Sequence, residues 1–221
     1  MTLQIETLSL RYPGQPALFA PLTLTIAPGQ VATVMGPSGV GKSTLLDAIG
    51  GHLGPDVTVS GRVVLNGRDV TRLAPEARRI GLLFQDALLF AHLSVGDNLA
   101  FGLSASVRGG ALRRARVQEA LEQAGLDGMA DRDPATLSGG QRARAALMRT
   151  LLADPLALLL DEPFSRLDAA LRADMRDFTF AHIRSRAIPT LMVTHDAEDA
   201  SAAAGPLITL HDQANAPRQV P

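Results

Sequence analysis

Apolar and polar residues alternate along two early segments of the chain, residues 3–10 (LQIETLSL) and 22–30 (LTLTIAPGQ). A period of two is typical of strands that bury one face of a sheet. Residues 61–70 (GRVVLNGRDV) carry Asn66-Gly67 between apolar residues, a strong hairpin signal because this pair tolerates positive φ. The pattern therefore predicts a small antiparallel sheet in the first part of the chain.

Three further segments are short and almost wholly apolar: residues 31–35 (VATVM), 156–160 (LALLL) and 190–194 (TLMVT). Such segments fit strands buried on both faces of a parallel sheet, and short buried helices are the alternative. They are followed by a glycine-rich loop from Gly36, by Asp161-Glu162 and by His195-Asp196. Because ligands of open α/β sheets bind at the carboxyl ends of the strands, we expect one site at that edge.

Helical periodicity replaces these patterns in the middle of the chain. Residues 111–126 (ALRRARVQEALEQAGL) place Val117, Leu121 and Ala124 on one helical face, and Gly125 is the predicted C-cap.

The predicted elements form a single domain with one insertion. We expect an α/β core made of residues 1–86 and 152–221, with a helical subdomain of residues 87–151 inserted in it. The tail after Ala214 (NAPRQVP) is expected to be disordered.

Composition narrows the classes of function. The chain has 221 residues, 46% of them hydrophobic, a formal net charge of −1 and no cysteine. No overall basic field is present to attract nucleic acid, and a disulfide framework or thiolate site is excluded. The basic cluster Arg113, Arg114 and Arg116 fits a solvated helix face better than a nucleic-acid site. We find no secretory signal, and the apolar stretches are too short to cross a bilayer, so a membrane role requires a partner.

Residues 36–44 (GPSGVGKST) match the phosphate-binding pattern G-x-x-x-x-G-K-[ST] between a predicted strand and a predicted helix. Its glycines let successive N–H groups point at phosphate oxygens, Lys42 supplies a charge for the β- and γ-phosphates, and the Ser43 hydroxyl is a candidate Mg²⁺ ligand. A glycine-rich surface turn is the alternative. The residues predicted to bind the phosphates are Gly36, Pro37, Ser38, Gly39, Val40, Gly41, Lys42, Ser43 and Thr44.

Polar residues follow two of the predicted buried strands. Asp161, in LLLDEP, can hold Mg²⁺ through water, and Glu162 can polarise an attacking water. The alternative is a helix-start cap followed by Pro163. His195 is more simply a structural residue, unless the strand before it lies next to the strand of Asp161.

Ser138 and Gln141 have the S-x-x-Q spacing of a capping box at a second helix start. The stretch LSGGQ at residues 137–141, with the phosphate-binding loop before it and LLLDEP after it, resembles the ATP-binding cassette (ABC) transporter family over nearly the whole chain. In that family the LSGGQ signature of one subunit closes over ATP held by another subunit. The resemblance therefore implies an α/β P-loop fold, ATP and Mg²⁺ as ligands, and an ATP-dependent homodimer.

The resemblance also assigns roles to single residues. It makes Glu162 the catalytic base, His195 a switch that contacts the γ-phosphate, and Gln85, in LLFQD, a contact of Mg²⁺ and the attacking water. Tyr12 lies where the family stacks an aromatic ring on adenine, and a strand-end packing residue is the alternative. The residues implied to contact ATP across the dimer are Ser138, Gly139, Gly140, Gln141 and Asp168.

Two features relate the chain to importers of this family. Residues 83–103 resemble the region with which importer ATPases contact a cytoplasmic helix of their membrane subunit, although Ser94 and Asp97 fit a helix cap equally well. Arg166, in SRLD, replaces the alanine that is more frequent in the family. The additional C-terminal regulatory domain of larger importers is not expected here.

The implied partners are integral membrane permease subunits and, indirectly, a solute-binding protein. The implied location is cytoplasmic, on the inner face of the cell membrane. The resemblance is strongest to small bacterial importer ATPases related to the thiamine and sulfate groups. The alternatives are a non-transport ABC ATPase with a mechanical or DNA-repair role, and a P-loop kinase or GTPase, which does not explain the signature.

Overall fold

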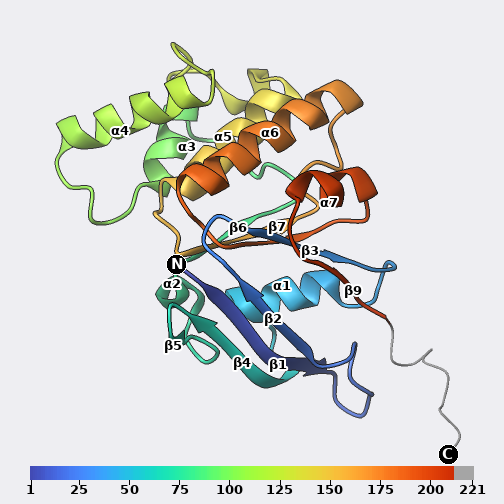
Figure 1. The fold of residues 1–221 in the computed structure, drawn as a ribbon. Coiled ribbons are helices and arrows are strands. Elements are labelled where there is room, and N and C mark those ends of the chain that lie inside the picture. The colour runs from blue at the N-terminus through green and yellow to red at the C-terminus, as the bar shows by residue number, and fades with distance from the viewer. Residues whose placement is uncertain (212–221) are drawn as a thin grey trace, which may run out of the picture.

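The computed structural model describes residues 1–211, and the tail after Ala214 lies outside them. A parallel sheet crosses the middle of the molecule, with helices above it (Figure 1). Helix α1 (Lys42–Gly50) lies below this sheet and separates it from an antiparallel sheet (Figure 1). This architecture confirms the predicted α/β fold class.

The antiparallel sheet is built by the first part of the chain, as predicted. Its strands are β1 (Leu3–Arg11), β2 (Leu22–Ile26), β4 (Thr58–Leu65) and β5 (Arg68–Asp69), in the order β2-β1-β4-β5. Asn66 and Gly67 form the turn between β4 and β5 with φ of 52° and 79°, and Leu65 pairs with Arg68 across it. Positive φ at both central residues fits a tight hairpin turn.

The parallel sheet contains the three apolar segments as neighbouring strands. Its members are β3 (Val31–Met35), β6 (Ile80–Leu83), β7 (Ala157–Asp161), β8 (Thr190–Val193) and β9 (Leu207–Thr209), in the order β6-β7-β8-β3-β9. The sequence pattern did not predict β6 and β9. Both are edge strands, whose formation depends on pairing with a neighbouring strand more than on their own pattern.

Helices fill the connections between the strands. They are α1, α2 (Pro75–Arg78), α3 (Val95–Gly102), α4 (Gly110–Gln123), η1 (Pro134–Thr136), α5 (Gly139–Leu151), α6 (Ala169–Ser185) and α7 (Ala197–Ala203). Between β6 and β7 the chain forms only helices and loops; the boundaries 87–151 of a helical subdomain stay a prediction. Within residues 1–211 no helix has both the length and the apolar character needed to cross a membrane.

Helix α4 ends slightly differently from the prediction. Leu121 and Ala124 are fully buried and Val117 packs against the core, as expected. The C-cap is Ala124 rather than Gly125. Gly125 follows it with a φ of 66°, the left-handed conformation that a glycine adopts just after a helix end.

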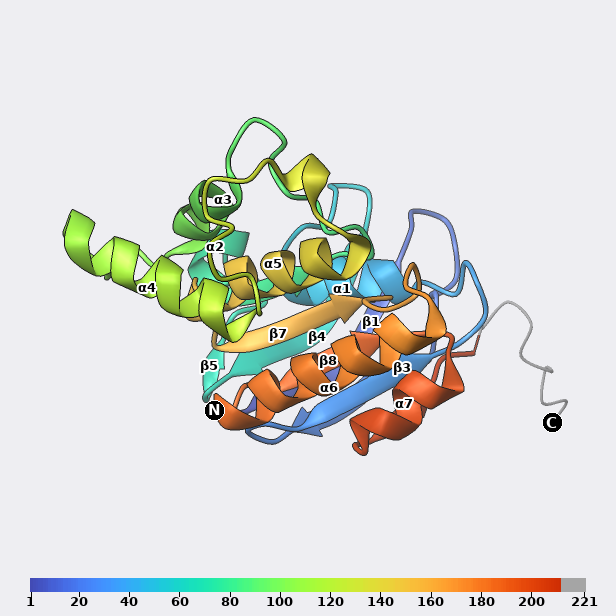
Figure 2. The ribbon, with the colours of Figure 1, turned by 90° about the horizontal axis from the view of Figure 1, so that it is seen from above.

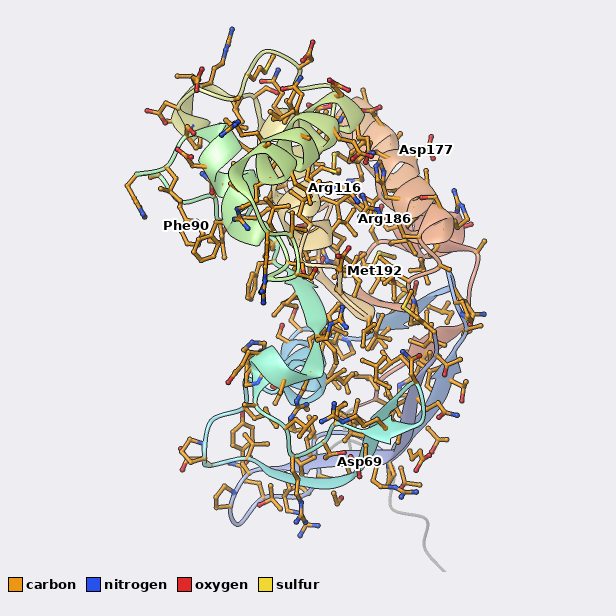
Figure 3. The ribbon with its side chains drawn as sticks, turned by 90° about the vertical axis from the view of Figure 1, so that its left-hand side faces the viewer. Asp69, Phe90, Arg116, Asp177, Arg186 and Met192 are labelled. Atoms are coloured by element: carbon orange, nitrogen blue, oxygen red, sulfur yellow. The ribbon has the colours of Figure 1, made fainter. Side chains whose placement is uncertain are left out.

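Two core clusters lie on opposite faces of the parallel sheet. Along β7, Leu158 and Leu160 belong to the cluster shared with α5 and α6, whereas Leu159 belongs to the cluster shared with α1 and the antiparallel sheet. Side chains alternate between the faces of a strand, so a wholly apolar strand buries both. Met192, on β8, lies in the middle of the molecule below α6 (Figure 3).

Candidate functional site

The parallel sheet brings the predicted site residues to one edge. Strand β7 pairs in parallel with both β6 and β8, and β8 pairs in parallel with β3. The segments that follow these strands therefore leave the sheet at the same edge. Strand β8, which precedes His195, lies next to β7, which ends in Asp161. A functional role for His195 required this neighbourhood of the two strands.

The phosphate-binding loop joins β3 to α1 and has no protein side chain as its cap. Gly41 is the N-cap residue of α1, with a φ of 100° and no side-chain hydrogen bond. An added Cβ there would lie 3.0 Å from Leu18 Cδ1, so the position favours glycine. Lys42 Nζ donates to the carbonyl oxygens of Gly36 and Pro37 at 2.8 and 3.0 Å, which holds its charge over the loop.

A pocket of about 290 Å³ combines this loop with the end of β7. Its lining residues are Ser38, Gly39, Gly41, Lys42, Ser43, Thr44, Asp161 and Glu162. Burial raises the pKa of the Asp161 carboxyl, the nearby carboxylates of Glu162 and Asp47 add to the rise, and the Ser43 hydroxyl and the Lys42 charge oppose it. A hydroxyl and a carboxylate that face each other beside a cationic side chain fit the oxygen donors that Mg²⁺ prefers.

Glu162 occupies a constrained position next to His195. Its φ is 49°, and its backbone N–H donates to the carbonyl of Val193 at 3.0 Å. Glu162 Oε2 lies 2.7 Å from His195 Nδ1, and the side chains are 17% and 69% exposed. Oε2 is buried and has no hydrogen-bond partner within residues 1–211. This carboxylate–imidazole pair lies at the sheet edge, beside the pocket that Glu162 lines.

The second helix start has its own side-chain cap, and the capping-box prediction is confirmed. Gln141 N–H donates to Ser138 Oγ at 3.2 Å, and Ser138 N–H donates to Gln141 Oε1 at 2.9 Å. Ser138 and Gly139 are exposed, and Gly140 is buried. None of residues 138–141 lines the pocket of the phosphate-binding loop.

Other predicted site residues also lie outside the lining of that pocket, namely Tyr12, Gly36, Pro37, Val40, Gln85, Asp168 and His195. Tyr12 is half-buried just after β1, and Gln85 is exposed just after β6. Asp168 is the N-cap residue of α6, where its Oδ1 accepts from the N–H of Leu171 at 3.0 Å. The structure therefore brings the phosphate-binding loop, Asp161 and Glu162 together in one pocket, with His195 next to Glu162. Gln85 follows β6 at the same edge of the sheet but does not line the pocket.

The structure adds one arginine that sequence reasoning missed, Arg172, and shows the contact of Arg166, which the sequence did not predict. Arg172 pairs with Asp196, the residue after His195, and also donates to the carbonyl of Ser165 at 3.4 Å. It thereby connects the segments that follow Glu162 and His195. Arg166 pairs with Asp86, next to Gln85. No motif in the sequence indicates either contact, because both partners are distant along the chain.

The region between β6 and α4 presents apolar side chains to the surface. Phe84, Leu88 and Phe101 are exposed, and Phe101 packs edge-on against Phe90, with ring centroids 4.7 Å apart. Phe90 lies at the margin of the molecule below α3 (Figure 3). Ser94 is the N-cap residue of α3 and accepts from the N–H of Asp97 at 3.1 Å, so this pair does cap a helix.

The fold and the site together define a P-loop nucleoside triphosphatase: a parallel sheet, a glycine-rich loop at a helix start, and two carboxylates at the end of the next-but-one strand. The sequence model of the ABC transporter family matches residues 19–165. The chain belongs to that family, and it is an ATPase of the ABC type.

Relatives and a solved structure agree with this assignment. The chain is 50% identical to the uncharacterized ABC transporter ATP-binding protein YnjD of Escherichia coli K12, over 90% of each chain. It is 47% identical to the thiamine import ATP-binding protein ThiQ of Cereibacter sphaeroides, over 88% of this chain and 83% of the relative. It is 48% identical to the sulfate/thiosulfate import ATP-binding protein CysA of Nocardia farcinica, over 85% of this chain and 56% of the relative.

The fold is similar to that of the ATP-binding cassette MJ0796, solved as a dimer in a post-hydrolysis state bound to ADP and Pi. The TM-score is 0.78 and the sequence identity 28%, and the match covers 95% of this chain and 94% of the other.

Proposed function

We propose that the chain is the ATP-hydrolysing subunit of a bacterial importer, and that two copies bind two ATP molecules at a shared interface. The relatives ThiQ and CysA are named as import ATP-binding proteins, and the solved cassette MJ0796 is a dimer. These findings support an importer and a dimer for this chain.

The observation that carries the proposal is the separation of the two helix starts. The phosphate-binding loop lines a pocket with Asp161 and Glu162, whereas Ser138 and Gly139 are exposed outside it. A site made by one copy alone would lack the signature. A second copy, related by a two-fold axis, supplies the missing signature to each site.

In the proposed site the phosphate-binding loop holds ATP. The loop amides of residues 36–44 and the Lys42 ammonium neutralise charge on the phosphates, and Tyr12 stacks on the adenine. Ser43, Asp161 and Gln85 are the residues that would hold Mg²⁺. Mg²⁺, when bound, neutralises charge that develops on the β- and γ-phosphate oxygens.

The remaining residues at the sheet edge act on water and the γ-phosphate. Glu162 accepts a proton from the attacking water, and its buried Oε2 without a hydrogen bond supports this role. His195, 2.7 Å from Glu162 Oε2, contacts the γ-phosphate. From the second copy, Ser138, Gly139, Gly140 and Gln141 close over the same phosphates, and Asp168 lies at the interface.

For the membrane side of the complex, we propose that the exposed apolar side chains Phe84, Leu88 and Phe101 contact a cytoplasmic helix of a permease subunit. A pocket of about 360 Å³ next to them, lined in part by Ala87, Leu89 and Pro134, extends this surface. This contact would place the chain on the inner face of the cell membrane, with a solute-binding protein as an indirect partner.

The test is Glu162→Gln, assayed with Mg²⁺ and ATP. We expect ATP binding to be retained, turnover to fall by about 100-fold or more, and an ATP-dependent dimer to accumulate in size-exclusion chromatography. Glu76→Gln, an exposed substitution on α2, is the matched control and should behave as the wild type. Turnover at the wild-type rate in the Glu162→Gln variant would refute Glu162 as the base.

A further inference from the structure

Gly140, in the signature, packs against α6 so closely that a side chain there would overlap the side chain of Leu171, which would have to move. An added Cβ would lie 2.4 Å from Leu171 Cδ1 and 3.0 Å from Leu171 Cδ2. Gly140 is buried, unlike its neighbour Gly139, whose added Cβ would meet no atom within 4 Å. The two glycines of the signature therefore have different surroundings within one copy of the chain.

Leu171 is itself fixed by the loop that carries Asp168. Its N–H donates to Asp168 Oδ1 at 3.0 Å, which caps the start of α6. The backbone of Leu171 is thus bound to Asp168 while its side chain covers Gly140. One residue connects the signature to the Asp168 loop, and both segments belong to the surface that the proposed function turns toward the partner's ATP.

Contacts one turn further along both helices extend this connection. Arg144, four residues after Gly140, pairs with Asp174 of α6. Its guanidinium also lies over the ring of Phe178, 5.1 Å from the centroid. Helices α5 and α6 lie next to each other above the parallel sheet, and Figure 2 shows the sheet face that they cover.

We propose that Leu171 is a positioning residue for the signature: its close packing on Gly140 holds Ser138–Gln141 and the Asp168 loop in one fixed arrangement. The inference rests on the proposed function, since the arrangement matters only if both segments act on ATP bound by a second copy. It gives Gly140 a role within its own chain, in addition to close approach to a phosphate.

The two roles of Gly140 predict different behaviour for a compensating substitution. If a Cβ at residue 140 only obstructed the partner's nucleotide, shortening Leu171 would not relieve it. If the Cβ instead displaces the signature from α6, Leu171→Ala makes room for it and restores the position. Leu171 is partly buried, so Leu171→Ala alone removes apolar contacts and does not stabilise the fold. A gain in stability therefore cannot explain recovery of activity in the double variant.

The experiment measures kcat and ATP affinity for Gly140→Ala, Leu171→Ala and the double variant in the full chain. We expect Gly140→Ala to lower kcat by about tenfold or more, because overpacking displaces the signature. A tenfold loss of rate corresponds to a free-energy cost within the range of such overpacking. ATP affinity should stay within about twofold, because the phosphate-binding loop is a separate site. The kcat of the double variant should be at least about threefold higher than that of Gly140→Ala.

The matched control is Gly140→Ala with Leu112→Ala, which shortens an exposed leucine on α4. This variant should be as slow as Gly140→Ala alone. The proposal is overturned if the variant with Leu171→Ala is equally slow, because the steric conflict would then lie with the nucleotide.

A stability measurement separates this inference from the proposed function. If the wild-type chain hydrolysed no ATP, the proposed function would be refuted, and the packing is then judged from urea unfolding of the same four proteins. Destabilisation of the double variant by less than the sum of the single variants supports the Gly140–Leu171 contact. Additive destabilisation contradicts it.

Discussion

The two glycine-containing helix starts differ in what satisfies their backbone N–H groups. At α1, Gly41 is the N-cap residue and no side chain caps the helix, while Lys42 extends back over the loop carbonyls. At α5, the side chains of Ser138 and Gln141 accept two of the N–H groups. The N–H groups at the first helix start have no side-chain acceptor. At the second helix start, two N–H groups donate to its own side chains.

This difference supports a division of roles between the two starts. Open amides with a charged lysine and two carboxylates in one pocket suit strong binding of a triphosphate and its metal. A capped start is more rigid, and its box does not use the N–H groups of Gly139 and Gly140. We infer that the first start binds ATP, whereas the second completes a site already filled.

Substitutions at the two starts should have the largest effects and separate binding from hydrolysis. Lys42→Ala removes the charge over the loop, so we expect ATP to bind about 10- to 100-fold more weakly. Ser138→Arg obstructs the signature, so ATP binding to the monomer should stay within about twofold. Both should lose hydrolysis by about 1000-fold. Calorimetric titration measures ATP affinity, and a phosphate-release assay measures hydrolysis. Weak ATP binding by Ser138→Arg would contradict the division of roles between the two helix starts.

Asp161→Asn sharpens the comparison on the side of the phosphate-binding loop. Hydrolysis should fall by about 100-fold or more, because metal-assisted charge stabilisation is worth several kcal/mol. In the ligand-free protein, by contrast, the same substitution should raise the free energy of unfolding at neutral pH. Since burial raises the pKa of Asp161 above 3.8, the folded state binds this proton more tightly than the unfolded chain.

The sign of the pH dependence follows from that pKa. The stabilising contribution of Asp161 is fully present below its unfolded pKa and is lost as the pH rises through its folded pKa. Asparagine does not titrate, so Asp161→Asn should gain stability relative to the wild type between about pH 4.5 and about pH 7.5. Urea unfolding at both values measures this change, and a relative loss at the higher pH would count against it.

Among these changes, Gln141→Ala should have the smallest effect on the free energy of unfolding, and this effect arises at the capped helix start. It removes the side chain that accepts from Ser138 N–H, so the free energy of unfolding should fall by about 0.5–1 kcal/mol. Gln15→Ala, in an exposed loop, is the control and should change little. Thermal unfolding measures both, and equal melting temperatures for the two variants would show that the capping box adds nothing.

Much of the fold could be predicted because its strands have distinct patterns. The alternation in β1, the Asn66-Gly67 turn and the apolar strand β7 follow from burial and turn chemistry. Strands β6 and β9 could not be predicted, since edge strands of this length depend on pairing with their neighbours rather than on their own pattern.

Two parts of the candidate site were predictable because they consist of residues close together along the chain. The loop of residues 36–44 and the capping box both depend on local spacing, and the structure forms both. The sequence did not predict that Leu171 covers Gly140 or that Arg172 connects Ser165 with Asp196. Those contacts join residues far apart along the chain, so only the packing of α5, α6 and the loops after the strands creates them.

The most direct test of the central claim is a mixture of two inactive variants. In a heterodimer of Lys42→Ala with Ser138→Arg, one site joins the intact phosphate-binding loop of the second variant to the intact signature of the first. An equal mixture assembling at random should therefore regain about a quarter of the wild-type ATPase rate, although neither variant hydrolyses ATP alone. A mixture as inactive as its components would contradict a site shared between two copies.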